Sequence, residues 1–242
     1  SQLFKVIFLL TALAVSIVSS SYFKDDEPHQ AEYYVLLLSS VLGMLITASA
    51  SDFLTLFVGI ELSAFSSYGL VAFRKKDDKS TEAGAKYLLI GAFSSALTLY
   101  GISLLYALTG SVTFEGVNAF LTGLENGVID GNFNELIFIS SLFIIGGLGF
   151  KIAVVPFHAW APDVYEGAPA PVTALLAAAS KAMGFVALLK VFIFTLEPFA
   201  EEWKLVFGII ALISMTIGNL AALSQKDICL LYTSPSPRDF QV

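Results

Sequence analysis

Long apolar runs, separated by short polar or charged segments, dominate the hydropathy pattern of this chain. About seven runs approach or exceed the roughly 20 residues that an α-helix needs to cross a hydrocarbon core. They are far longer than β-strands, whereas a membrane β-barrel would show short alternating segments. The pattern therefore predicts an all-α, polytopic bundle of transmembrane helices at residues 3–22, 32–50, 52–73, 81–108, 133 to a break within 151–162, 170–196 and 203–223.

Polar segments between the runs indicate where these helices end. Asp52 is suited to cap the third helix, and the Gly- and Asn-rich residues 110–132 predict a long connection with a short surface helix near 114–124. Basic residues prefer the cytoplasmic side of a membrane. With alternate crossings, most basic loop residues fall on one side, which we expect to be cytoplasmic, with Ser1 outside: Lys24, Arg74, Lys75, Lys76, Lys79 and Lys226.

Composition agrees with a membrane protein and excludes several other classes. The chain is 56% hydrophobic and 14% charged, with a mean hydropathy of +0.78, which is too apolar for a soluble domain. The net charge is −7, and no basic patch suits nucleic acid. The hydropathy indicates that the chain lies in the lipid bilayer. The single cysteine, Cys229, excludes an intrachain disulfide and a CxxC metal site. The chain begins in an apolar run without a methionine, and we expect it to be a fragment.

Four ionisable residues lie well inside the apolar runs. Glu61 falls near the middle of the third run, and Lys151, Lys181 and Lys190 fall in the fifth and sixth. Each would cost about 2.5–3.5 kcal/mol if isolated in a membrane, so pairing or contact with water must offset the penalty. A desolvated lysine can change its proton occupancy when a neighbouring carboxylate moves. Glu61, Lys151 and Lys181 are therefore candidate proton-relay residues, with Lys181 near the bilayer midplane.

Structural alternatives exist for these charges. For Glu61 and Lys151 the alternative is a buried ion pair that serves only packing specificity. Lys190 and Lys86 lie a few residues from predicted helix ends, where a lysine ammonium commonly reaches back to the membrane interface. We expect this interfacial placement for both.

The segment after Lys151 predicts a break in the fifth helix. Pro156 has no N–H group, so the carbonyl of Ile152 loses its helical partner and the helix should kink or end just after Lys151. Backbone groups freed inside a membrane must be satisfied by protein or water, and transporters use such breaks to coordinate ions. His158 is an accessory proton-carrier candidate, with a histidine at the membrane interface beside Trp160 as an equal alternative. No second ligand with metal-binding spacing accompanies it, so no metal site is expected.

Asp163 and Glu166 follow in a proline-rich stretch, WAPDVYEGAPAP. The prolines argue against a continuous helix through this stretch, and a helix N-terminus would favour acidic side chains. We expect a solvated turn on the cytoplasmic side, with a helix N-terminus as the alternative.

Several stretches resemble one family of membrane proteins. The main one is GFKIAVVPFHAWAPDVYEGAPAPVTALLAAASKAMGF, and the others are LTLFVGIELSAFSSYGLVAF, EAGAKYLLIGAFSSALTLYGISLLY and GNLAALSQKDI. They resemble the antiporter-like membrane subunits of respiratory complex I, and among them the subunit N family of NADH-quinone oxidoreductase. The related subunits L and M and the multisubunit cation/proton antiporters usually carry a histidine pattern in the helix after the break. Lys181 in SKAMGF stands there in this chain, as in subunit N.

The resemblance implies a fold of fourteen transmembrane helices in two inverted five-helix units, each with a broken helix. Residues 1–231 match roughly the third to ninth of these helices, as part of one antiporter-like transmembrane domain. The chain leaves the family pattern after this point, and residues 232–242 are expected to be a divergent tail that is not native coding sequence.

The resemblance also implies roles for individual residues. Glu61 matches a family glutamate that modulates the protonation of Lys151, protons pass along Lys151 and Lys181, and Lys86 matches a less central lysine. The chain would then be a subunit of a proton-translocating NADH:quinone oxidoreductase in a prokaryotic cell membrane, beside neighbours of the K, M and L type. No cofactor site is expected in this chain, because flavin and iron–sulfur clusters belong to partner subunits.

Two other functions fit the same features. A subunit of a multisubunit sodium/proton antiporter would share the fold and the buried lysines. A structural scaffold subunit would use the buried charges only to hold helices together.

Overall fold

The computed structural model describes residues 2–23, 29–129, 131 and 133–224, and over these residues the chain is helical. Within these residues, seven helical segments are long and apolar enough to cross a membrane, as the sequence predicts. They are α1 (Gln2–Tyr22), α2 (Gln30–Ser49), α3 (Phe53–Val71), α4 (Asp78–Thr109), α6 (Asn134–Ile152), the segment Ala170–Thr195, and the segment Glu197–Leu220, which lies largely within α10 (Ala200–Ser224). The predicted tail, Cys229, Lys24 and Lys226 lie outside the described residues.

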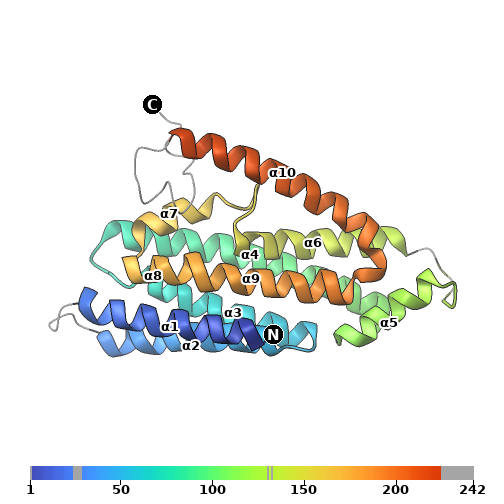
Figure 1. Ribbon diagram of the computed structural model, residues 1–242, viewed down its shortest axis with the longest axis horizontal. Coiled ribbons are helices and arrows are strands. Elements are labelled where there is room, and N and C mark those ends of the chain that lie inside the picture. Colours follow the sequence, from blue (N-terminus) through green and yellow to red (C-terminus); the bar gives the residue numbers. More distant parts are fainter. Residues whose placement is uncertain (1, 24–28, 130, 132, 225–242) are drawn as a thin grey trace.

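The helices α4 and α6 form the centre of the bundle (Figure 1). In Figure 1, α4 and α6 run side by side through the middle with the segment Ala170–Thr195, while α1, α2 and α3 lie along one side. The helix α10 runs obliquely along the other side and contacts the bundle sparsely (Figure 1). The helices α5 (Phe114–Glu125) and α7 (Trp160–Gly167), which lie outside the candidate membrane spans, are at opposite ends of the bundle (Figure 1). The helix α5 is the predicted surface helix, and α7 follows the break.

Glycines allow the central helices to approach closely. A Cβ atom on Gly147 of α6 would lie 1.8 Å from Thr98 Oγ1 of α4, and one on Gly43 of α2 would lie 2.6 Å from the carbonyl oxygen of Gly59 on α3. Small residues are how transmembrane helices pack in lipid, where burial of apolar surface drives little association. At the α4–α6 contact Ser94 Oγ also donates a hydrogen bond to the Gly147 carbonyl, at 2.7 Å. The α4–α6 pair is therefore fixed where it carries Lys151.

The ends of the third and sixth predicted helices show one agreement and one difference. Asp52 caps α3 as predicted, because its side chain accepts a hydrogen bond from the Thr55 N–H at 2.7 Å. The sixth span is not one regular α-helix. It consists of α8 (Ala170–Leu175), a π-helical segment (Leu176–Ser180), α9 (Lys181–Leu188) and a second π-helical segment (Leu189–Thr195). Such π-helical turns inside α-helices occur frequently at functional sites, and the first one leads directly into Lys181.

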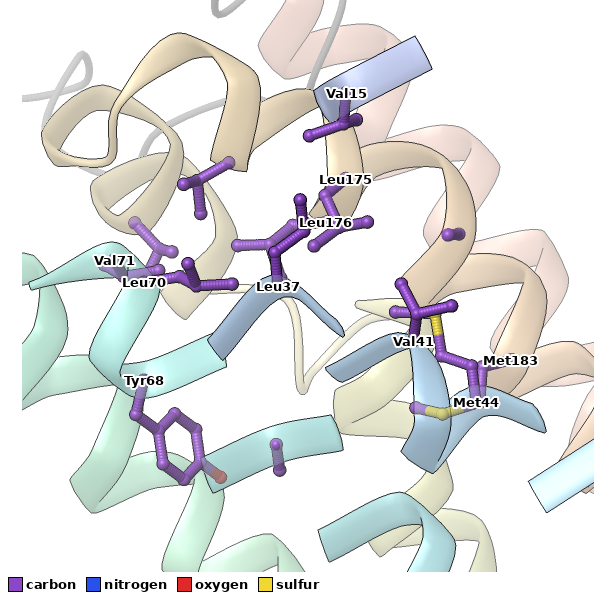
Figure 2. Close-up of a cluster of buried hydrophobic side chains, with 14 of the residues drawn as sticks. Val15, Leu37, Val41, Met44, Tyr68, Leu70, Val71, Leu175, Leu176 and Met183 are labelled. Atoms are coloured by element: carbon purple, nitrogen blue, oxygen red, sulfur yellow. The ribbon is translucent and has the colours of Figure 1, made fainter. Parts of the chain in front are cut away.

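Apolar side chains fill the interior and also cover the outside. Figure 2 shows part of the core, where α1, α2 and α3 meet the segment Ala170–Thr195 around Val15, Leu37, Val41, Met44, Tyr68, Leu70, Val71, Leu175, Leu176 and Met183. On the outside, Leu89 of α4 is 71% exposed and Phe194 is 70% exposed. Helices that satisfy their own backbone and present apolar side chains outward suit a hydrocarbon surround. The chain is an integral, multi-pass membrane protein.

Candidate functional site

The helix α6 ends where the sequence predicts a break. Its last residue is Ile152, and Ala153 adopts a left-handed conformation with φ 56°. Helical structure resumes only at Trp160, the first residue of α7. The predicted break just after Lys151 is therefore confirmed.

Groups from neighbouring elements satisfy the backbone at this break. The carbonyl of Ile152, which loses its helical partner, accepts a hydrogen bond from Lys181 Nζ at 3.2 Å. The indole N–H of Trp160 donates to the Phe150 carbonyl at 3.0 Å. On the other side, the N–H of Val155 donates to Ser214 Oγ of α10 at 3.1 Å. Side chains from other parts of the chain thus satisfy the backbone groups at the break, and Lys181, one of the predicted relay lysines, is among them.

Lys151 lies in the last turn of α6 with only 4% of its surface exposed. Its ammonium lies 5.7 Å from the centroid of the Phe150 ring, within the range of a cation–π contact. A lysine at a helix C-terminus also interacts favourably with the helix dipole. Within the described part of the chain, Lys151 has no ion-pair partner, although the Glu61 carboxylate acts on it electrostatically.

Glu61 lies near the middle of α3 and is only partly exposed. Its Oε1 accepts a hydrogen bond from Ser95 Oγ of α4 at 2.6 Å, which is a short, charge-assisted bond. Ser95 was not among the residues that the sequence singles out. The contact joins residues 34 positions apart, so no local pattern predicts it.

Lys181 reaches the break from α9, of which it is the first residue. Besides donating to the Ile152 carbonyl, its ammonium lies 5.3 Å from the centroid of the Trp160 ring and 5.7 Å from that of Tyr165. A Cβ atom on Gly184, one turn after Lys181, would lie 3.3 Å from the Lys151 Cβ atom. The lack of a side chain at Gly184 therefore lets α9 approach the turn of α6 that carries Lys151.

Aromatic rings line the space between the buried charges. The rings of Tyr87 and Trp160 stack with centroids 4.7 Å apart, Phe150 lies 4.8 Å from Trp160, and Tyr68 lies 4.8 Å from Tyr87 in an edge-to-face arrangement. The hydroxyls of Tyr68 and Tyr165 are buried without a hydrogen-bond partner among the described residues. Burial also raises the pKa of Tyr165 above its ordinary value. Tyr68 follows Glu61 by two helical turns on α3, and that spacing was the available sequence signal for this cluster.

His158 falls in the connection between α6 and α7. Its Nδ1 atom is buried without a hydrogen-bond partner in the described residues. Burial lowers the pKa of the imidazole, and a hydrogen bond to the Pro156 backbone carbonyl opposes this shift. The helix ends before His158, so the seven-residue spacing does not place it on a common helical face with Lys151. In the described parts of the chain, no group of three or more His, Cys, Asp or Glu residues is arranged to hold a metal ion.

The expected solvated turn at Asp163 and Glu166 is wrong. Asp163 lies in the first turn of α7, its side chain is 18% exposed, and its Oδ2 lies 2.7 Å from the ammonium of Lys86. Lys86 also lies 2.8 Å from Glu82 on its own helix, and Glu166 pairs with Lys79 at 2.8 Å. The prolines allow this short helix because Pro162 falls in its first turn, where a missing N–H costs little. These ion pairs tie α7 to the first turns of α4.

Lys190 is at the other end of the bundle from α7. Its ammonium donates a hydrogen bond to the carbonyl of Ala50, the residue that follows the last turn of α2. Lys190 therefore contacts a helix end, and its position at the membrane interface stays a prediction. Lys86 lies two turns into α4, and its ammonium is held by carboxylates, so its interfacial position stays a prediction.

Comparison with known proteins agrees with this architecture. Residues 50–232 match the family described as NADH:quinone oxidoreductase/Mrp antiporter, TM. Among curated relatives, NADH-quinone oxidoreductase subunit N of Desulfitobacterium hafniense is 46% identical over 93% of this chain and 44% of the relative. F(420)H(2) dehydrogenase subunit N of Methanosarcina mazei is 41% identical over 97% of this chain and 46% of the relative. The chain thus spans less than half the length of these relatives.

Solved structures give the same picture. A chain of respiratory complex I from Thermus thermophilus is 32% identical, with a TM-score of 0.76 over 96% of this chain and 47% of that one. A chain of the archaeal membrane-bound sulfane sulfur reductase is 27% identical, with a TM-score of 0.75 over 95% of this chain and 46% of that one. A chain of the Mrp complex from Dietzia sp. DQ12-45-1b shares the fold at 19% identity. Because the family match covers most of the residues, this chain belongs to the NADH:quinone oxidoreductase/Mrp antiporter transmembrane family.

Proposed function

We propose that this chain is part of a proton-translocating membrane subunit of the NADH-quinone oxidoreductase subunit N type. In this proposal, electron transfer from NADH to quinone in partner subunits drives proton movement across a prokaryotic cell membrane. Flavin and iron–sulfur clusters would lie in those partners, and the membrane neighbours would be subunits of the K, M and L type. The names of several relatives at 40–46% identity support this assignment.

One observation carries the proposal: buried Lys151 and half-buried Lys181 meet at the break of a transmembrane helix, and Lys181 donates to the carbonyl that the break frees. The ammonium of Lys181 is held by that carbonyl and by two aromatic rings, which are neutral. Lys151 is buried, its ammonium lies over the Phe150 ring, and the Glu61 carboxylate acts on it electrostatically. A lysine whose partners are neutral can lose its proton without leaving an unpaired carboxylate beside it. We therefore assign the relay to Glu61, Lys151 and Lys181.

The relay would work through changes in the distance between Glu61 and Lys151. A carboxylate near Lys151 favours the ammonium form, and its withdrawal favours release of the proton into the site. Lys181, at the far side of the break, is the next acceptor along the path. His158 and Lys86 are accessory candidates: His158 has a buried nitrogen without a partner in the described residues, whereas Lys86 is held by two carboxylates.

The test uses the complete subunit in its native membrane complex, in sealed vesicles that respire on the donor of that complex. We expect Glu61→Gln to leave assembly unchanged on native gels and to lower proton uptake, followed by a pH-sensitive dye, on the order of tenfold. A matched control is Glu201→Gln, which removes an exposed carboxylate paired with Lys204. Loss of assembly in Glu61→Gln, with normal proton uptake per assembled complex, would favour a scaffold role instead.

A sodium/proton antiporter subunit is the second candidate, because the matched family and the Mrp fold include antiporters. The same vesicles separate the two functions. Our proposal requires proton uptake that continues when sodium is replaced by choline. Uptake that depends on sodium, and that sodium gradients alone can drive, would identify an antiporter.

A further inference from the structure

The serine that holds Glu61 has a second acceptor within reach. Ser95 Oγ lies 2.6 Å from Glu61 Oε1 and 3.0 Å from the carbonyl oxygen of Gly91, one turn earlier on α4. A serine hydroxyl carries a single proton, so it can donate to only one of these two oxygens at a time. Rotation about the Cβ–Oγ bond is enough to move the proton from one acceptor to the other. The hydroxyl therefore has two hydrogen-bonded positions, and only one of them involves Glu61.

In the arrangement seen here, Ser95 holds Glu61 and no ion pair joins Glu61 to Lys151 among the described residues. The two charges nevertheless act on each other electrostatically. Attraction between unlike charges in a weakly polar surround is strong, so an opposing contact must keep the carboxylate in place. The short hydrogen bond from Ser95 on α4 is a contact that can oppose this attraction.

We propose that Ser95 is a positioning residue that controls whether Glu61 pairs with Lys151, an inference that rests on the proposed proton relay. When the hydroxyl donates to Glu61, the carboxylate stays against α4. When the hydroxyl turns to the Gly91 carbonyl, Glu61 is released and can move to Lys151. No covalent bond changes, because the serine proton stays on its oxygen and only its acceptor differs. The serine keeps one hydrogen bond in both states, which makes the exchange inexpensive.

The surroundings of Gly91 fit such an exchange. The Tyr68 hydroxyl lies against Gly91, since a Cβ atom there would come 2.0 Å from it, and this buried hydroxyl has no hydrogen-bond partner in the described residues. Tyr68 also interacts electrostatically with Glu61. Two hydroxyls, those of Ser95 and Tyr68, therefore lie near Gly91. The ionisable groups that interact electrostatically here are Glu61 and Tyr68 on α3 and Lys151 on α6.

The experiment compares Ser95→Ala with Ser95→Thr in the complete complex. Alanine removes the donor, so Glu61 should pair with Lys151 in a high-resolution structure, and proton uptake per electron should fall on the order of tenfold. Threonine keeps a hydroxyl that can also bond to the carbonyl one turn earlier, so it should retain most of the uptake. The matched control is Ser94→Ala, which removes the neighbouring hydroxyl and its bond to Gly147 without touching Glu61.

Each outcome decides the inference. Normal proton uptake in Ser95→Ala together with impaired uptake in Glu61→Gln would overturn the role of Ser95 and leave the relay standing. Normal uptake in both variants would overturn the relay, and the inference with it. Equal losses in Ser95→Ala and Ser94→Ala, with Glu61 unmoved in the structure of Ser95→Ala, would reduce Ser95 to a packing residue.

Discussion

The two groups of charges in this bundle are held in opposite ways. Where α7 meets α4, Lys86 and Lys79 are paired with carboxylates at 2.7–2.8 Å. Around the break in α6, Lys151 and Lys181 are held by neutral groups, namely a backbone carbonyl and aromatic rings. A paired lysine keeps its proton, because losing it would strand a carboxylate. The difference suggests a division of labour, in which paired charges fix α7 and charges with neutral partners exchange protons.

The largest expected effect is on Lys151. Lys151→Met keeps the length of the side chain but removes the proton site, and proton uptake should fall on the order of tenfold or more while assembly persists. The measurement is dye-monitored uptake normalised to assembled complex. Lys204→Met, which removes an exposed lysine paired with Glu201, serves as the control. Unchanged uptake in Lys151→Met would remove Lys151 from the relay.

Variants of the paired charges should lower the stability of the complex and leave proton uptake unchanged. Asp163→Asn breaks the ion pair with Lys86, and we expect a loss of ~1 kcal/mol in stability, because both side chains keep some contact with the surface. The midpoint of thermal unfolding of the complex should fall, with uptake per assembled complex unchanged. Asp163→Glu, which keeps a carboxylate opposite Lys86, should hold the midpoint close to that of the parent protein. A variant that assembles normally but does not pump would place this pair in the relay.

The close contact between α4 and α6 provides a third comparison. Gly147→Ala places a methyl group 1.8 Å from Thr98 Oγ1, and we expect about 1–3 kcal/mol of destabilisation from overpacking. Gly208→Ala on α10 is the control, because no atom lies within 4 Å of its added methyl group, and alanine favours a helix. Thermal unfolding of both variants checks this. Equal midpoints would mean that the α4–α6 contact tolerates separation.

The smallest expected effect concerns pH. Burial lowers the pKa of His158, so the folded protein binds its proton less readily than the unfolded chain does. The associated stability is fully present above the ordinary value of about 6.5 and is lost as pH falls from there toward the lowered folded value. Thermal unfolding between about pH 7.5 and about pH 5 should show this slope. His158→Gln should flatten it, and an unchanged slope would contradict the assignment.

Sequence and structure agree where the causes are local. The missing N–H of Pro156 predicts the break after Lys151, and hydropathy predicts the seven spans. The contact between Ser95 and Glu61 and the pair of Lys86 with Asp163 could not be predicted, because each joins residues on different helices, 34 and 77 positions apart. The wrong expectation at Asp163 had the same origin: proline composition predicts a turn, but docking on α4 stabilises a short helix.

The most direct test of the division of labour is proton uptake per electron in Lys181→Arg. Arginine keeps the positive charge and can donate to the Ile152 carbonyl, but it does not release its proton at any accessible pH. The account predicts that the Lys181→Arg complex assembles and transfers electrons. Its proton uptake per electron should be lower than that of the parent complex, on the order of tenfold. Uptake at the parent rate in Lys181→Arg would show that only the charge of Lys181 matters, and would contradict the relay.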